Sequence, residues 1–347
     1  ERLRAKAAAQ GYAPAHSMTR TVPLGFNVRG ISTLYNTKGE VASQWVKSSA
    51  DDAARTKAMR ESFEAMSEEL PRLDAVGPHA GLTESKLLTL YTLTDSHVGA
   101  ACEAALGGAD WNQAEAERVL VGCFAQMVNS SPPAEVGFIN QLGDFLHSDG
   151  VALEAVTPQH RHILDQDGRF PSLAATAVRI LRQVITLALG KHERVVVLLA
   201  EGNHDMASSV WLRLMFRVLY ENEPRVTVID SELPYYIWSH GKVMLAFHHG
   251  HMKKMEGLPL LFASQFPKVW GDAAVRIAHT GHRHHGQEQS KEYSGMTVIQ
   301  HPTLAARDAY AARGGWMSER SVTAITYHSA YGQVARTTVT PEMLLAA

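Results

Sequence analysis

The sequence has little cysteine and no long apolar run, and both shortages exclude classes of protein. Two of its 347 residues are cysteines, Cys102 and Cys123, too few for a disulfide framework. We therefore expect a reducing compartment, the cytoplasm. No run of about 18 apolar residues is free of charge, so we expect no membrane span and no membrane partner. No charged and apolar leader opens the chain, so no secretory signal is expected.

Charge of one sign is also lacking, because the formal net charge is −2 and the pI is near 6.9. This balance excludes a protein that binds nucleic acid through its overall charge. The first 60 residues differ, with ten Lys or Arg against four acids. They form either a solvated basic surface or a phosphate-binding arm. The 45% hydrophobic and 20% charged residues exclude a disordered chain, a collagen-like repeat and a coiled coil.

Histidine, in contrast, is abundant and unevenly distributed. Seven of the 18 histidines lie between His248 and His285. Histidine is the commonest metal ligand and titrates near neutral pH. The bias therefore predicts a functional site that includes this part of the chain.

Short apolar runs alternate with helical patterns from Leu87 onward, which predicts an α/β fold. The apolar runs cover residues 87–94, 136–142, 194–200, 243–247 and 276–278. The helical patterns cover residues 112–129, 172–190 and 207–220. Each apolar run ends in a cluster of Asp, Asn, His or Gly. Because ligands collect at the carboxyl ends of strands in α/β sheets, the five clusters predict one site.

The domain organisation follows from the same patterns. Residues 1–20 resemble a basic linker or frayed helix, and residues 21–85 an accessory region with a hairpin around residues 36–39 and a helix over 51–70. We expect the catalytic domain to span 86–341. Within it, we expect 145–193 to be a long insertion that roofs the site, and the hairpins of 294–341 to complete the second sheet.

The residue types in the clusters predict two metal ions. In chain order the clusters are Asp95-Ser96-His97, Gly143-Asp144, Gly202-Asn203-His204-Asp205, His249-Gly250 and Gly281-His282-Arg283-His284. Carboxylate, imidazole and amide oxygen donors suit Mn, Fe or Zn rather than Ca or Mg alone. The donors are too many for one tetrahedral zinc, whereas two ions bridged by one carboxylate use them all. Two adjacent ions suit in-line attack on phosphorus.

In this order, the five motifs resemble those of the calcineurin-like metallophosphoesterases, over roughly residues 88–290. The resemblance implies a β-sandwich of two mixed sheets flanked by helices, with the active site at the carboxyl ends of the strands. It implies two divalent ions, manganese first, with iron or zinc as alternatives. One ion would be held by Asp95, His97, Asp144 and His284, and the other by Asp144, Asn203, His249 and His282. His249 is chosen over His248 and His251 by its His-Gly pair.

The resemblance also implies catalytic roles. His204 matches the histidine that contacts the scissile phosphate and protonates the leaving oxygen, and Asp205 matches the carboxylate that orients it. The run from Gly143 to His147 is similar to the double-strand-break repair nuclease branch. There His147 would position the phosphodiester or its leaving nucleoside; the alternative is a surface histidine.

Three cations are candidate substrate-binding residues. Arg283 lies between two expected ligands and could bind a phosphate oxygen, although strand alternation turns it away from the ions. Lys253 and Lys254 follow the histidine cluster and could line a nucleic-acid path. Solvated surface residues are the alternative for all three.

The expected function is a two-metal phosphodiesterase acting on nucleic acid, first of all a DNA nuclease. The alternatives are a phosphomonoesterase or small-nucleotide phosphodiesterase, and a nucleic-acid-binding protein without turnover. Phage and bacterial proteins of this make-up belong to the same family resemblance. The chain begins with Glu1 rather than Met, which is compatible with a DNA-binding module upstream of it. A homodimer is also compatible with the sequence.

Overall fold

A computed structural model describes residues 26–50, 77, 81–150, 155–158, 160–284, 289–308, 312, 314–315 and 319–344. The chain divides into two compact units. The smaller contains Glu1–Glu61 with Val151–Leu153, and the larger Ser62–Gly150 with Glu154–Ala347. The linker expected over 1–20 and the helix expected over 51–70 lie outside the described residues.

The described part of the smaller unit is an antiparallel hairpin, β1 (Phe26–Tyr35) and β2 (Val41–Ala50). Its turn is at the predicted place. The Asn36 side-chain oxygen accepts from the backbone N–H groups of Lys38 and Glu40, both at 2.9 Å. Gly39 has φ of 78°, a left-handed conformation that glycine adopts without steric cost.

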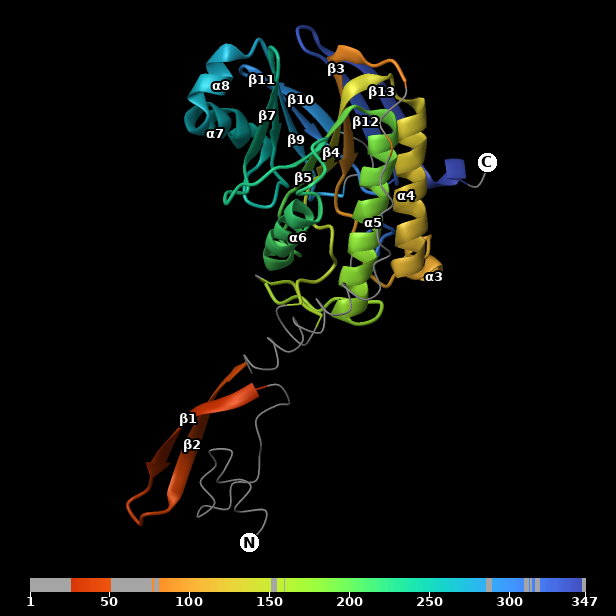
Figure 1. The fold of residues 1–347 in the computed structure, drawn as a ribbon. Coiled ribbons are helices and arrows are strands. Elements are labelled where there is room, and N and C mark those ends of the chain that lie inside the picture. Colours follow the sequence, from red (N-terminus) through yellow and green to blue (C-terminus); the bar gives the residue numbers. More distant parts are fainter. Residues whose placement is uncertain are drawn as a thin grey trace. The chain divides into compact units, whose positions relative to one another are not determined.

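The larger unit is built on two mixed sheets (Figure 1). One sheet has the order β13 (Gly332–Val339), β12 (Val322–His328), β3 (Glu84–Leu93), β4 (Ala134–Gln141), β5 (Arg194–Leu199), β6 (Val226–Val228). Its strands β3 to β6 are parallel, and β12 is antiparallel to both neighbours. The other has the order β10 (Gln289–Tyr293), β11 (Met296–Gln300), β9 (Val275–Thr280), β8 (Val243–Phe247), β7 (Tyr236–His240). Its outer pairs are antiparallel and its inner pairs parallel.

The two sheets share one apolar core. It takes Leu90 and Phe138 from the six-stranded sheet and Leu245 and Phe247 from the five-stranded sheet. The rings of Phe138 and Phe247 stack with centroids 5.0 Å apart. Two sheets packed face to face in this way confirm the predicted sandwich architecture.

Helices cover the outer faces of both sheets (Figure 1). The six-stranded sheet is covered by α4 (Gln113–Ser130), α5 (Phe170–Lys191) and α6 (Met206–Leu219). The five-stranded sheet is covered by α7 (Leu258–Gln265) and α8 (Pro267–Asp272). The short helices α3 (Ala104–Gly107), η2 (Met255–Gly257) and η3 (Pro341–Leu344) complete the described elements. The α4 helix begins where Asn112 caps it, accepting from the N–H of Glu115.

The structure changes two expectations about the second half of the chain. The helical part of 145–193 is a core element of the fold. It is α5, which connects parallel strands β4 and β5 and packs its apolar side into the core. By length and composition alone α5 is apolar enough to cross a membrane, but most of it is buried inside the protein. Residues 294–341 also do not complete a single sheet, because β11 joins the five-stranded sheet whereas β12 and β13 join the six-stranded one.

Candidate metal centre

The predicted ligands meet at the carboxyl ends of five strands. Asp95 and His97 follow β3, Asp144 follows β4 and Asn203 follows β5; His249 follows β8, and His282 and His284 follow β9. Three groups of side chains bring their donor atoms within 4.8 Å of one another: Asp95, Asp144, His249 and His282; Asp95, His97 and His284; His97, His147 and His204. Asp95 belongs to both carboxylate-containing groups, whereas the family resemblance gave the shared role to Asp144.

The site has a buried floor and a more open rim. The side chains of Asp95, Asp144 and His249 are 1%, 2% and 0% exposed, whereas that of His284 is 39% exposed. Nε2 of His249 lies 3.1 Å from the Asp144 carboxylate, and Nε2 of His284 lies 3.0 Å from Asp95. The ligand set therefore extends from buried carboxylates to the partly exposed ring of His284.

The two carboxylates of the floor, Asp95 and Asp144, stay ionised despite their burial. Burial raises the pKa of Asp95, but His284 and His249 outweigh it and hold that pKa well below its usual range. The same balance of burial against His249 and His204 lowers the pKa of Asp144. Burial lowers the pKa of His249, but Asp144 and Asp95 outweigh it and raise it to about 10. Two ionised carboxylates thus share the floor, and both can serve as ligands of a divalent cation that takes the place of these protons.

The backbone around the ligands is strained. Five of the predicted ligands adopt positive φ: Asp95 51°, His97 42°, Asp144 49°, His282 71° and His284 42°. Non-glycine residues rarely adopt this conformation, which costs about 1–3 kcal/mol at each position and occurs most often at functional sites. The turns after β3, β4 and β9 are therefore shaped to aim side chains at one point.

Three glycines leave the room that the ligands occupy. A methyl group at Gly202 would lie 2.7 Å from the carboxyl carbon of Asp144, and one at Gly281 would lie 2.6 Å from Oδ2 of Asp95. At Gly143 it would lie 2.6 Å from Cγ of His249. The glycines of the three motifs are thus explained by close packing against the ligands.

The residues present fit divalent ions. Among the described residues, the buried Oδ1 of Asn203 has no hydrogen-bond partner, and Nε2 of His249 faces the Asp144 carboxylate at 3.1 Å. An unpartnered group is costly to bury unless something else satisfies it. Nδ1 of His249 lies 2.8 Å from the carbonyl of Leu142, which leaves Nε2 aimed at the site. With oxygen and imidazole donors and no thiolate, the site suits Mn, Fe or Zn.

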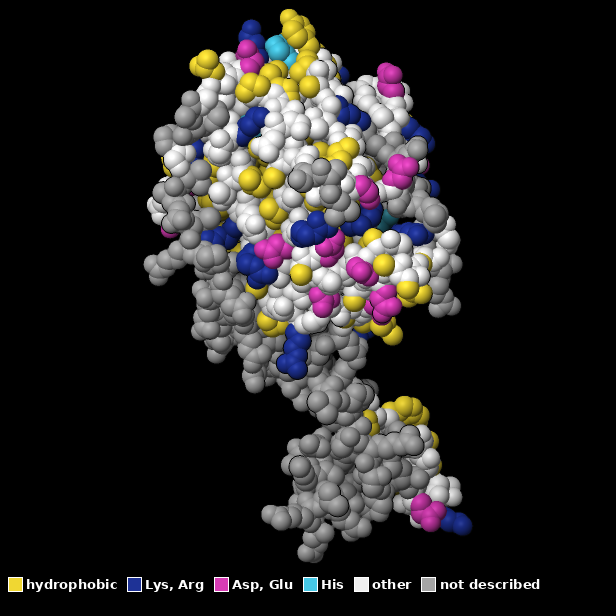
Figure 2. Space-filling view, turned by 90° about the vertical axis from the view of Figure 1, so that its right-hand side faces the viewer, with side chains coloured by type: hydrophobic (Ala, Val, Ile, Leu, Met, Phe, Trp, Pro, Cys, Tyr) yellow, Lys and Arg dark blue, Asp and Glu magenta, His cyan; other side chains and the backbone are white. Residues whose placement is uncertain are grey.

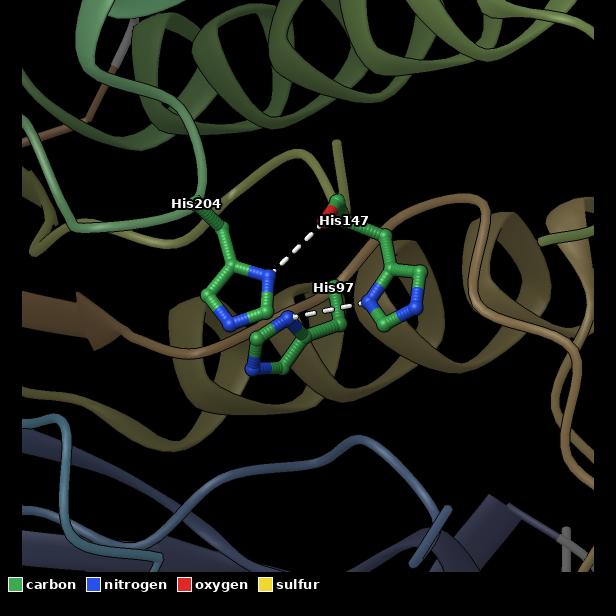
Figure 3. Close-up of side chains that lie close together, drawn as sticks. All are labelled: His97, His147 and His204. Carbon is green, nitrogen blue, oxygen red and sulfur yellow. Dashed lines mark hydrogen bonds between the residues drawn. The ribbon is translucent and has the colours of Figure 1, made fainter. Parts of the chain in front are cut away.

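His204 and Asp205 lie at the site, but they do not pair as expected. Nδ1 of His204 donates to the carbonyl of His147 at 2.8 Å (Figure 3). The Asp205 carboxylate instead accepts from the backbone N–H groups of Phe145, Leu146 and Gly202, at 2.8, 3.2 and 2.9 Å. Asp205 therefore fastens the turn after β5 to the turn after β4, and a carbonyl orients His204.

His147 lies behind His97 rather than at the surface. Its residue exposure is 3%, and its Nδ1 lies 3.3 Å from Nδ1 of His97 (Figure 3). Burial lowers its pKa to about 3, so the ring is neutral at pH 7. The structure thus excludes the surface-histidine alternative, and it gives His147 a protein partner in place of open solvent.

The three candidate substrate-binding cations, Arg283, Lys253 and Lys254, are exposed. Arg283 stands between His282 and His284 in the turn after β9, and the two lysines follow the turn after β8.

Some side chains that lie beside the ligands were not among the predicted site residues. The ring of His251 lies 5.4 Å from that of His249 and 6.2 Å from that of His282. Thr94 donates to the Asp95 carboxylate and Thr303 to the Asp95 carbonyl, both at 2.6 Å. The position of Thr94 beside the first motif was a signal for its role. Thr303 lies far away in sequence and offered none.

Comparison with known proteins gave distant structural matches. No protein-family model and no curated protein matches the chain. A conserved uncharacterized protein from Streptococcus pneumoniae, described as a predicted phosphoesterase, is 12% identical with a TM-score of 0.32, covering 74% of this chain and 91% of that one. A single mutant of Vps29 from Entamoeba histolytica is 13% identical with a TM-score of 0.29, covering 73% and 98%. Wild-type Vps29 complexed with Zn²⁺ from the same organism is 14% identical with a TM-score of 0.27, covering 74% and 99%. At these TM-scores the functional argument depends on the site itself.

Proposed function

We propose that this protein is a metal-dependent phosphoesterase with a two-ion centre. The observation that carries the proposal is the pair of overlapping ligand groups on one buried floor, with Asp95 common to both. Manganese is the first ion to test, with iron and zinc as alternatives. Asn203, whose buried oxygen has no partner among the described residues, would complete the second group.

Bound ions and the side chain of His204 would have different roles in the reaction. Ions bound at the floor would supply Lewis-acid polarisation of phosphate oxygens and activation of a water nucleophile. His204 holds its Nδ1 proton on the His147 carbonyl, so its Nε2 is the atom that can carry a second proton. From there the protonated ring can give that proton to a leaving oxygen, as a general acid. The backbone N–H of His204 donates to Oδ1 of Asp144 at 2.8 Å and so ties this acid to the floor.

Within this class, the first substrate to test is a nucleic-acid phosphodiester, as in a DNA nuclease. Its support is the set of exposed cations Arg283, Lys253 and Lys254, which follow the same strand ends as the ligands. On the face seen in Figure 2, Lys and Arg are interspersed with Asp and Glu. The described part of that face therefore offers no continuous basic track, and the three cations are the ones to neutralise in a binding test.

A phosphomonoesterase or small-nucleotide phosphodiesterase is the second candidate. The burial of His147 favours it, because the nuclease reading asked that side chain to touch the phosphodiester. A ring with 3% exposure that already lies beside His97 has little surface to offer a substrate.

The test is hydrolysis in Mn²⁺ of single-stranded DNA, duplex DNA, a chromogenic phosphodiester and a chromogenic phosphomonoester. His97→Ala removes a ligand and His204→Ala removes the acid. The matched control is His160→Ala, an exposed histidine of the loop that follows β4. DNA cleavage that is lost in both variants and kept in the control would support the nuclease. Cleavage of the monoester alone would support the second candidate, and no hydrolysis with any ion would refute an esterase.

A further inference from the structure

His147 is fixed beside His97 by the backbone of both turns. The N–H of His97 donates to the carbonyl of Asp144, the N–H of Val98 to that of Phe145, and the N–H of His147 to that of Val98, at 3.0, 2.8 and 3.0 Å. These bonds join the turn after β3 to the turn after β4 like a short piece of parallel sheet. The two imidazoles are therefore held together by the fold.

The contact between the rings requires one donor and one acceptor. The rings of His97 and His147 are nearly perpendicular, at 82°, with Nδ1 facing Nδ1 at 3.3 Å. A neutral imidazole carries one N–H, and burial disfavours the charged form. One ring must therefore hold its proton on Nδ1 and the other on Nε2.

The position of His97 in the proposed centre decides which ring is the donor. Nε2 of His97 lies 3.2 Å from Nε2 of His284, on the side of the Asp95 group, and it can bind an ion only when it carries no proton. The proton of His97 is then on Nδ1, and Nδ1 of His147 accepts from it.

We propose that His147 is a positioning residue, which fixes His97 in the tautomer and orientation that bind a metal ion. The imidazole of His147 takes the place of the usual carboxylate or carbonyl partner of a metal-bound histidine. This inference depends on the proposed two-ion centre. It differs from the nuclease reading because the side chain of His147 acts on a ligand and not on the substrate.

The test is calorimetric titration with Zn²⁺ or Mn²⁺ alone, with no substrate. His147→Ala should weaken binding of one of the two ions about 10–100-fold and leave the other nearly unchanged. His147→Asn keeps an acceptor at the δ position and should recover most of that loss. His162→Ala, an exposed histidine of the same loop, is the matched control and should bind like the wild type. The His147 carbonyl remains in every variant, so His204 keeps its partner.

The outcomes separate this role from the proposed function. If His147→Ala binds both ions like the wild type and only raises KM, His147 touches substrate and the inference is wrong. If the wild type binds no ion, the two-ion centre is refuted together with it. If His147→Ala does not fold, His147→Asn decides, because the inference requires its affinity to stay close to that of the wild type. In the Zn²⁺-loaded wild type, nitrogen-15 NMR should find the His97 proton on Nδ1; a proton on Nε2 would overturn the assignment.

Discussion

Gly202 packs directly against the expected ligand Asp144, and adding one methyl group there should disable the metal centre. A Cβ on residue 202 would lie 2.7 Å from the carboxyl carbon of Asp144, closer than real Cβ atoms approach other heavy atoms. Asp144 cannot easily retreat, because its Oδ1 accepts from the N–H of His204 and its Oδ2 lies 3.1 Å from His249. Gly202→Ala must therefore displace the carboxylate or push the turn after β5 outward.

The expected magnitude has two parts. Overpacking a tight site costs about 1–3 kcal/mol in the free energy of unfolding. A displaced ligand is at least as harmful as a lost supporting partner, which weakens metal affinity about 10–100-fold. With ions at about 1,000 times Kd, binding stabilises the wild type by roughly 4 kcal/mol. A 100-fold loss of affinity would remove about 2.7 kcal/mol of that.

The assay is thermal unfolding with and without Zn²⁺, together with titration of the ion. Gly190→Ala is the matched control, because among the described residues no atom outside the helix's own backbone lies within 4 Å of a Cβ added there, and the residue is in helix α5. It should leave metal affinity unchanged and raise stability by up to about 1 kcal/mol. A Gly202→Ala protein with wild-type affinity and an unchanged rise of Tm in Zn²⁺ would refute this account of the glycine.

Three further predictions concern the protons held by the site, the backbone hydrogen bonds of Asp205 and the apolar core. Burial lowers the pKa of His249 but nearby carboxylates raise it to about 10, and His284 is also raised against burial. His249 then carries a proton at pH 7, so ion binding should release protons and tighten as pH rises, which calorimetry would detect as a buffer-dependent heat. The same heat in every buffer would contradict this prediction. Asp205→Asn places an amide N–H₂ group where the carboxylate accepts from backbone N–H groups, so the free energy of unfolding in urea should fall by about 1–3 kcal/mol. An unchanged urea midpoint would mean that Asp205 does not stabilise the two turns. Leu181→Ala in α5 should cost about 2–5 kcal/mol, whereas the exposed Leu106→Ala should cost far less; equal small losses would mean that α5 is not a core helix.

The site at the strand ends was predictable because each buried apolar run is followed directly in sequence by its polar cluster. Each apolar run from Leu87 onward became a strand, and the polar cluster after it came to the edge where parallel strands end together. The ligands gathered because the sheet order places β3, β4 and β5 side by side, and β8 beside β9. Local pattern and general topology were sufficient for that part.

The partners of the site residues were not predictable, because they depend on contacts between distant turns. Asp205 was expected to orient its neighbour His204, yet its carboxylate reaches three backbone groups, two of them about 60 residues earlier. The place of β12 in the sheet depends on its pairing with β3, which lies more than 200 residues earlier. Nothing in a short window of sequence distinguishes these pairings from their alternatives.

The turn after β4 connects the two halves of the proposed chemistry. It supplies the Asp144 carboxylate to the floor, the His147 ring to His97, and the His147 carbonyl to His204. At its end, Asp149 accepts from the first N–H groups of α6, the helix that follows Asp205. A shift of this turn would therefore move a metal ligand and the general acid together. Changes within it should be non-additive with changes at His97 or His204, because residues that share one support do not contribute independently.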